Sequence, residues 1–268
     1  MGYAKSSIKL SEIMNYIETL APRELQEGYD NSGLILGNPN TGVARVLVCL
    51  DVCLDALETA ISKDCQLIVS HHPAIFKAIK VFTEDTREGE LLVKAVTNHL
   101  AIYSAHTNFD SAAGGLTDLL CKKLGLKDTG VIQKNLYANS EGGFGRYGTV
   151  DAIQGKNFIK MLKMTLSLPA VRLVGYVPES ISKVAVYNGA YDRGILNDLK
   201  TLKPDVLVTG DLKYHDAQEL AENSLFTIDA GHYGTEKIFA EEMSALLKSE
   251  FPHLGVLPYE GADIFTFA

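Results

Sequence analysis

The sequence predicts an α/β protein with mostly parallel sheet, whose two halves have a similar architecture. Short apolar runs such as 45–52 and 205–210 alternate along the chain with helix-favouring segments of about ten residues, which is typical of strand–helix–strand units. The 268 residues are 46% hydrophobic and 22% charged, which suits one large domain or two medium ones with a substantial core. Between the halves, the polar and glycine-rich stretch 127–150 indicates a domain crossing.

Each half is expected to be a series of strands and helices. Ile13, Ile17 and Leu20 recur at helical spacing before Pro22, so the chain opens with an amphipathic helix. The other elements expected in the first half are strands over 45–52, 67–69 and 101–105 and helices over 54–63, 89–100 and 115–124. Those expected in the second half are helices over 156–166, 194–202, 217–223 and 235–248 and strands over 171–177, 183–187, 205–210, 225–229, 255–259 and 264–267.

Composition excludes several classes of function. The formal net charge is −8 and no block of Lys or Arg stands out, which argues against a protein that coats nucleic acid. The four cysteines form no Cys-x-x-Cys pair, so free thiols in a reducing compartment are expected. No apolar run reaches membrane-spanning length and the first residues lack a signal-peptide core, so a cytoplasmic protein without membrane contact is expected. P-loop, dinucleotide-binding and nucleophile-elbow motifs are absent from the sequence.

Two adjacent histidines, His71 and His72, end a buried strand just before Pro73. Pro73 cannot continue the strand as a ladder partner, so both imidazoles are expected where the strand gives way to a loop. In α/β sheets that edge is where ligands bind. The alternative is that one histidine packs in the core and the other is exposed, as is common for histidine.

Other ligand-type residues follow other predicted strands. His106 and Asp110 follow the strand 101–105, His215 follows 205–210, and His232 and Glu236 follow 225–229. Glu236 could instead complement a helix dipole and Asp110 could be an N-cap, but five of the seven histidines fall just past strand ends. If a helix begins at His232, Glu236 lies on the same face. A His, Asp and Glu set without cysteine suits Zn, Mn, Fe, Co or Ni.

The adjacent histidines favour two ions over one. Successive side chains of an extended backbone point apart, so His71 and His72 cannot easily reach the same ion. Each could serve one of two ions with a carboxylate between them, and such a pair would share a hydroxide that attacks a hydrolysable substrate. The residues therefore predict a dinuclear metal-dependent hydrolase.

Five motifs in order resemble the NIF-three-like family, also known as type 2 GTP cyclohydrolase I homologues or dinuclear metal-centre hexameric proteins. They are Tyr29–Gly33, His71-His72-Pro73, Asn108–Asp110, Thr209–His215 and Ala230–Glu236. The resemblance implies two related α/β lobes with mixed or parallel sheets flanked by helices and a metal cleft between them. We expect residues 1–126 with 232–268 to form the first lobe, which carries most metal ligands, and 127–231 to form the second.

The resemblance also implies residue roles, partners and an activity. According to the resemblance, the metal ligands are His71, His72, Asp110, His232 and Glu236. His106 is expected close to the metals, as a supporting group or catalytic proton shuttle. Two divalent transition-metal ions per chain, a homohexamer, and a nucleotide or phosphoester substrate such as GTP are expected. The alternative is a non-enzymatic metal-binding scaffold that interacts with transcription factors or nucleic acid. Where many family members have a glycine/serine-rich turn, this chain has Tyr-Asn-Gly-Ala-Tyr-Asp at 187–192. If that turn contacts the substrate, a different substrate is expected here.

Overall fold

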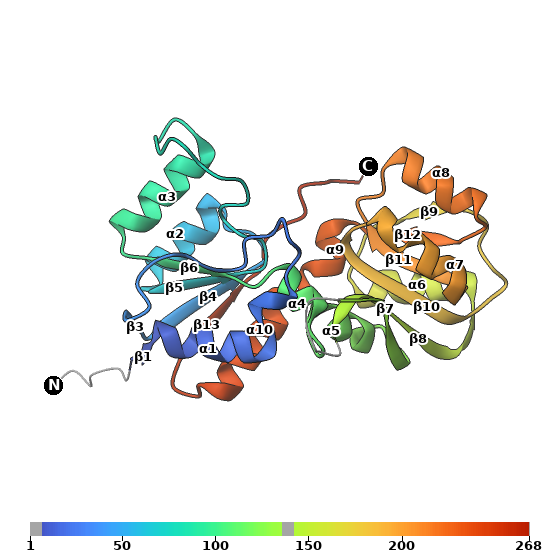
Figure 1. Ribbon diagram of the computed structural model, residues 1–268, viewed down its shortest axis with the longest axis horizontal. Helices are drawn as coiled ribbons and strands as arrows, with labels where there is room; N and C mark the ends of the chain where they lie inside the picture. The colour runs from blue at the N-terminus through green and yellow to red at the C-terminus, as the bar shows by residue number, and fades with distance from the viewer. Residues whose placement is uncertain (1–6, 136–141, 268) are drawn as a thin grey trace. The chain divides into compact units, whose positions relative to one another are not determined.

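The computed structural model describes residues 7–135 and 142–267 and divides the chain into two compact units (Figure 1). Unit 1 comprises 1–109 with 237–262, and unit 2 comprises 110–236 with 263–268. The chain thus passes from unit 1 to unit 2 at Phe109–Asp110, returns at Glu236–Lys237 and passes to unit 2 again at Ala262–Asp263. Each unit is a sheet flanked by helices, which confirms the predicted mixed α/β class.

Unit 1 contains a five-stranded sheet in the order β13-β4-β5-β6-β2. The first four of these strands are parallel and β2 runs antiparallel to β6. The strands of the unit are β1 (Ile8–Lys9), β2 (Gly33–Leu36), β3 (Gly42–Val43), β4 (Arg45–Cys49), β5 (Leu67–Ser70), β6 (Ala101–Ser104) and β13 (Gly255–Tyr259). Its helices are α1 (Leu10–Leu20), η1 (Arg23–Leu25), α2 (Leu54–Ser62), α3 (Arg87–Thr97) and α10 (Ile238–Glu250), and α4 (Thr107–Ser111) spans the first crossing.

Helices cover both faces of this sheet. The central strands are buried apolar runs with little alternation, as parallel strands covered on both sides require. Leu57 of α2 and Leu91 of α3 pack with Ile68 and Ile102 in one buried cluster. Figure 1 shows α2 and α3 over one face and α1 and α10 over the other. This packing fixes the ends of β5 and β6, where the predicted histidines lie.

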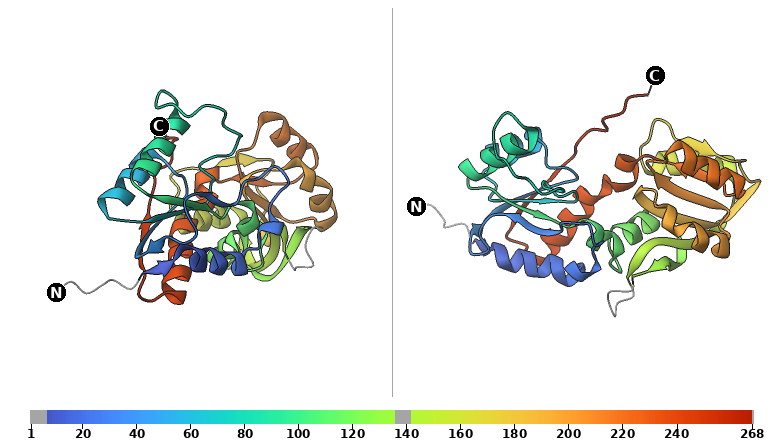
Figure 2. Two further views of the ribbon diagram at one scale, coloured as in Figure 1. Left: turned by 60° about the vertical axis from the view of Figure 1, so that its left-hand side comes forward. Right: turned by 45° about the horizontal axis from the view of Figure 1, so that its top comes forward.

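Unit 2 contains a six-stranded sheet in the order β7-β8-β10-β11-β12-β9, in which β10, β11 and β12 are parallel. Its strands are β7 (Lys127–Lys134), β8 (Gly143–Gln154), β9 (Arg172–Val174), β10 (Ser180–Ala190), β11 (Val206–Gly210) and β12 (Thr227–Asp229). Its helices are α5 (Leu116–Lys123), α6 (Gly155–Thr165), η2 (Arg193–Ile195), α7 (Leu196–Leu202), α8 (Tyr214–Glu222) and α9 (His232–Glu236). Helices α7 and α8 cover one face, where Leu199 and Leu220 pack on Leu207, and α5 and α6 contact β8 and β10 (Figures 1 and 2).

The interpretation of 127–150 as a domain crossing is wrong. The described part of this stretch forms the antiparallel strands β7 and β8, and residues 136–141 lie outside the described residues. Its glycines are there because the two strands approach closely: a Cβ on Gly143 would lie 2.3 Å from the Gln133 carbonyl oxygen. The same atom on Gly148 would lie 2.8 Å from the carbonyl oxygen of Lys127. Glycine here marks close backbone approach within a sheet.

Two further expectations change near the C-terminus. The helix expected over 235–248 is two helices, α9 and α10, which meet at Lys237. The strand expected over 264–267 is wrong, because those residues form neither helix nor strand and Ile264 is 87% exposed. Within the described ranges, no helix combines the length and apolar character needed to cross a bilayer.

Candidate metal centre

Three histidines of unit 1 lie together at the ends of neighbouring strands. His71 and His72 directly follow β5, and His106 follows β6. The ring centroids are 5.1 Å apart for His71 and His72, 5.2 Å for His71 and His106, and 5.5 Å for His72 and His106. One ring nitrogen from each of the three lies within 4.8 Å of the others, so this group could hold a metal ion. The predicted proximity of strand-end histidines is therefore present within unit 1.

The adjacent histidines are held by opposite neighbours of β5. His71 Nδ1 is 2.8 Å from the carbonyl oxygen of Ala105, just after β6. His72 Nδ1 is 2.7 Å from Oδ1 of Asp51, just after β4. A carbonyl and an ionised carboxylate can only accept, so Nδ1 is the donor in both rings, and Nε2 is the nitrogen that can bind a cation when the ring is neutral. The two rings are tilted by 45° to each other, in keeping with side chains that leave the backbone in different directions.

His106 is held by a buried carboxylate. Its Nδ1 is 2.7 Å from Oδ1 of Asp30, whose side chain is 0% exposed. Burial alone would raise the pKa of Asp30, but hydrogen bonds from His106, the Thr107 hydroxyl and the Asn31 amide outweigh it and hold the pKa well below its usual range. Asp30 is thus ionised, accepts the hydrogen bond from Nδ1 of His106 and fixes the orientation of the ring. The backbone amide of Thr107 also donates to Asp30, at 3.1 Å.

In unit 2, His232 and Glu236 stand on one face of the short helix α9. The helix begins at His232, so the spacing of four residues brings His232 Nε2 to 2.9 Å from Glu236 Oε2. Nδ1 of the same ring is 2.9 Å from Oδ2 of Asp211, just after β11. His232 therefore shares one feature with the histidines of unit 1, an Nδ1 held by an oxygen acceptor, while its Nε2 lies against Glu236.

Asn188, near the end of β10, joins the two predicted carboxylate ligands. Its side-chain nitrogen donates to Asp110 Oδ1 at 2.7 Å and to Glu236 Oε1 at 3.2 Å. Its side-chain oxygen accepts a 2.6 Å hydrogen bond from the hydroxyl of Thr117, which fixes the orientation of the amide. Two carboxylates that share one amide nitrogen lie close enough together to share a cation as well.

Gly189 makes room for this arrangement. Its φ is +65°, and a Cβ there would lie 2.2 Å from Glu236 Oε1 and 3.5 Å from His232 Nε2. Its amide donates to the hydroxyl of Thr235 at 2.9 Å, which ties β10 to α9. Only glycine satisfies both the left-handed backbone and the close approach of the carboxylate.

The predicted site residues thus form one group in each unit. Unit 1 brings together His71, His72 and His106, and unit 2 brings together Asp110, His232 and Glu236. His215 lies in the first turn of α8, exposed, with its ring centroid 5.4 Å from that of Tyr214.

Four supporting residues were not singled out from the sequence: Asp30, Asp51, Asn188 and Asp211. Asp51 and Asp211 directly follow strands that neighbour histidine-bearing strands, and that position could have identified them.

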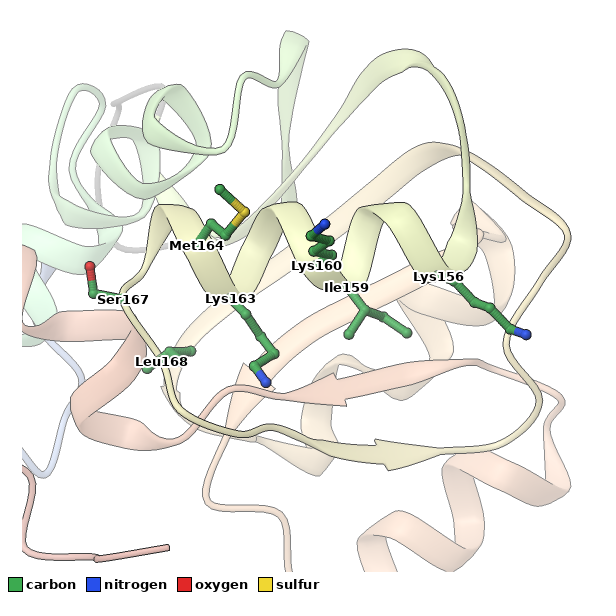
Figure 3. A pocket seen from close by; sticks show the side chains of 7 residues that line it. All are labelled: Lys156, Ile159, Lys160, Lys163, Met164, Ser167 and Leu168. Carbon is green, nitrogen blue, oxygen red and sulfur yellow. The ribbon is translucent and has the colours of Figure 1, made fainter.

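A separate hollow of about 470 Å³ runs along α6 in unit 2 (Figure 3). It is lined by Lys156, Ile159, Lys160, Lys163, Met164, Ser167 and Leu168, a set that contains none of the predicted ligands. Lys156, Lys160 and Lys163 follow one another along α6 at spacings of four and three residues. The hollow is therefore a basic surface of its own, distinct from the histidine and carboxylate groups.

The fold and these groups define a class: a protein of two α/β units whose histidine and carboxylate side chains could hold metal ions. The family model for Duf34/NIF3 (NGG1p interacting factor 3) matches residues 8–261, and the chain belongs to this family. The resemblance drawn from the motifs is thereby confirmed.

Curated relatives agree with this membership. A "GTP cyclohydrolase 1 type 2 homolog" from Clostridium acetobutylicum is 32% identical over 251 residues, covering 93% of each chain. A "GTP cyclohydrolase 1 type 2" from Helicobacter pylori is 29% identical over 240 residues, covering 90% of this chain and 92% of the relative.

Solved structures share the fold. A Bacillus cereus protein related to NIF3 superposes with a TM-score of 0.91 at 23% identity, over 98% of this chain and 100% of that one. A hypothetical protein from Staphylococcus aureus superposes with a TM-score of 0.90 at 26% identity, with the same coverage.

Proposed function

We propose that this protein is a dinuclear metal-dependent hydrolase that acts on a nucleotide-type substrate. The observation that carries the proposal is the hydrogen bonding of four histidine rings. The rings of His71, His72, His106 and His232 each direct Nδ1 to a fixed oxygen acceptor. Histidines that ligate metals nearly always donate their other N–H to a carboxylate or a backbone carbonyl, which sets the tautomer and aims the free lone pair.

The donor set fits two divalent transition-metal ions. In the proposal, His71, His72 and His232 supply nitrogen ligands, and Asp110 and Glu236 supply oxygen ligands, to one pair of ions. A set of imidazoles and carboxylates without thiolate suits Zn, Fe, Mn, Co or Ni. The two hydrogen bonds of Asn188 support a shared role for the two carboxylates, because they hold Asp110 and Glu236 around one point.

Bound ions would supply an activated water as nucleophile and would polarise the atom under attack. His106 is proposed to move a proton through Nε2, since Asp30 holds its Nδ1 and keeps the ring oriented. The names of the curated relatives motivate GTP as the first substrate to test, with attack at the imidazole carbon of the guanine ring. In that reaction His106 would transfer protons while the carboxylates bind the ions.

Metal content is the first test. Elemental analysis of protein purified without chelator is expected to give about two transition-metal ions per chain. A chain that remains without metal after supplementation with Zn, Mn, Fe, Co and Ni in turn would refute the proposal. The same measurement on Asp110→Ala is expected to show a loss of bound metal.

Turnover is the second test. Formate release from GTP by the metal-loaded protein, abolished in Asp110→Ala, would establish a cyclohydrolase. The matched control is Asp151→Ala, since Asp151 lies in the same unit with a side chain 92% exposed and contacts Lys127. If GTP gives no formate, a screen of nucleotides and phosphoesters with the same variants decides whether any hydrolysis depends on Asp110.

A second candidate function, a metal-binding scaffold that binds nucleic acid, is favoured by one observation. Lys156, Lys160 and Lys163 gather along the α6 hollow although the chain as a whole is acidic (Figure 3). Salt-dependent binding of single-stranded DNA, weakened in Lys160→Gln, would support it. Retention of that binding in His71→Ala/His72→Ala protein that has lost its metal would show that the scaffold role does not need the metal site.

Assembly and location complete the proposal. We propose a homohexamer, as the family resemblance implies, and a cytoplasmic location; size-exclusion chromatography with light scattering tests the assembly. The cysteines support a reducing compartment, because Cys49, Cys53, Cys65 and Cys121 are all free thiols.

A further inference from the structure

Two aromatic rings of unit 1 are exposed beside the histidine cluster. Tyr29 is 67% exposed and Phe76 is 47% exposed, whereas Tyr103 and Phe109 of the same unit are buried. The centroids of the Tyr29 and Phe76 rings are 6.1 Å apart and their planes are inclined by 63°. Two adjacent exposed rings form contiguous apolar surface, the kind of surface that a ligand can cover.

Both aromatic residues are connected to His106, Phe76 by a ring contact and Tyr29 through the neighbouring Asp30. The Phe76 ring lies edge-to-face against His106, with centroids 6.1 Å apart and planes at 83°. Tyr29 immediately precedes Asp30, which holds the Nδ1 of His106. A hydrogen bond of 2.7 Å from the side-chain nitrogen of Asn31 to the carbonyl oxygen of Ile75 joins the two segments that carry the rings.

We propose that Tyr29 and Phe76 stack the planar base of a purine nucleotide and so present its ring to the histidine cluster. The inference rests on the proposed hydrolase function and names the residues that select its substrate class. Aromatic rings bind bases through their faces. Because the Phe76 ring contacts His106 and the Tyr29 ring contacts Phe76, a base stacked on their exposed faces would lie within reach of His106. Neither residue takes part in proton transfer or metal binding in this proposal.

A purely structural role gives a different expectation. If the two rings only hold the segments around residues 29 and 76 together, an apolar replacement of similar size changes stability and leaves ligand preference unchanged. Phe76→Leu and Tyr29→Leu keep apolar bulk but remove the flat face, whereas Tyr29→Phe keeps it. Phe82→Leu is the matched control, because Phe82 is 58% exposed and follows Phe76 by six residues.

The test compares GTP with inorganic triphosphate as probes of the full-length, metal-loaded protein, by isothermal titration calorimetry. We expect GTP to bind about tenfold or more tightly than triphosphate. Phe76→Leu and Tyr29→Leu are each expected to weaken GTP binding about five- to one-hundred-fold, the range of base–aromatic stacking, without affecting triphosphate. Tyr29→Phe and Phe82→Leu are expected to bind both probes as the unchanged protein does.

The outcomes separate this inference from the hydrolase proposal. A base preference that requires Phe76 and Tyr29, without turnover of any nucleotide, keeps the stacking site and refutes the hydrolase. Metal-dependent turnover in a protein that binds GTP and triphosphate equally well refutes the stacking site alone. Variants that change the oligomeric state or lower the melting temperature, while the base preference persists, show that the aromatic pair is structural and also overturn the inference.

Discussion

Units 1 and 2 hold their ligand-type residues in opposite ways. Unit 1 contributes imidazoles, and each is held by its own acceptor: Ala105 for His71, Asp51 for His72 and Asp30 for His106. Unit 2 contributes two carboxylates that share one amide, that of Asn188, and a single imidazole. Each imidazole is therefore oriented by a separate acceptor, which for His232 is Asp211, whereas the two carboxylates of unit 2 are oriented by one shared side chain.

The difference has an electrostatic consequence. Imidazoles with protonated Nδ1 and a lone pair at Nε2 are neutral and can lie together without repulsion. Two carboxylates around one amide repel each other, so unit 2 gains more from a bound cation than unit 1 does. Ligand-induced stabilisation by metal should accordingly act mainly through Asp110 and Glu236.

The largest loss of stability is expected for a substitution of Arg146, which anchors the segment that follows Asp110 in unit 2. Arg146 is 2% exposed, bonds Asp118 at 2.7 Å and donates to the carbonyl oxygens of Ser111 and Ala112. Arg146→Met leaves Asp118 without its cation and these carbonyls without their donor. We expect about 3–5 kcal/mol of lost stability, measured by urea unfolding of the metal-free protein.

The control is an ion pair on the surface of the same unit. Arg193 bonds Glu219 at 2.6 Å, but its side chain is 69% exposed, so Arg193→Met is expected to leave the urea midpoint close to that of the unchanged protein. Equal effects of the two substitutions would show that the buried arginine is not what fixes the segment beyond Asp110.

The alternation of apolar runs with helical segments was enough to predict the parallel strands of both units, because buried parallel strands leave that pattern in the sequence. The β7–β8 pair escaped prediction, since Gly143 and Gly148 look like a linker when the strand opposite them is unknown. The break at Lys237 also left no local signal, as the apolar pattern continues into α10. Close approach between distant segments decides such features, and single-sequence patterns do not contain it.

The histidines and carboxylates were predicted because ligand-type residues follow the ends of strands. The residues that hold them by hydrogen bonds were not assigned that role from the sequence. Asn188 lies inside a strand, and only the fold shows that its amide reaches Asp110, 78 residues away in sequence. Asp30 was noted in a motif without a role, since its partner His106 is 76 residues away. Long-range hydrogen bonds of this kind are set by topology.

A substitution at Gly189 is expected to disturb the shared carboxylate arrangement directly. Gly189→Ala places a methyl group where Glu236 Oε1 lies, in a left-handed backbone conformation. We expect about 2–4 kcal/mol of lost stability and a loss of metal from Glu236. Gly114→Ala is the matched control, because Gly114 has a φ of +75° but nothing within 4 Å of the added Cβ. If both variants bind metal equally, the close approach of Glu236 is unimportant.

The acceptors behind the imidazoles allow the two units to be compared on equal terms. Asp51→Ala in unit 1 and Asp211→Ala in unit 2 each remove the partner of one Nδ1, at His72 and His232. Each is expected to weaken metal binding about 10–100-fold, measured by competition with a chromophoric chelator. Asp64→Ala, at a side chain 86% exposed, should leave the affinity unchanged. An unchanged affinity in both test variants would refute the role assigned to these carboxylates.

The smallest effect concerns Asp205, a carboxylate of unit 2 remote in sequence from the predicted ligands. Partial burial would raise its pKa, but hydrogen bonds from the amides of Lys183 and Ser182 outweigh it and lower the pKa below the ordinary 3.8. A lowered folded-state pKa means that the ionised form stabilises the fold above about pH 4 and that this contribution is lost as pH falls through the folded-state pKa. Asp205→Asn should therefore cost under about 1 kcal/mol at pH 7, since the group is largely solvated, and the difference from the unchanged protein should shrink between pH 4 and pH 2. Urea unfolding of the two metal-free proteins across this range measures it. A difference that grows on acidification would contradict the assignment and would mean that the amides of Ser182 and Lys183 do not favour the ionised carboxylate.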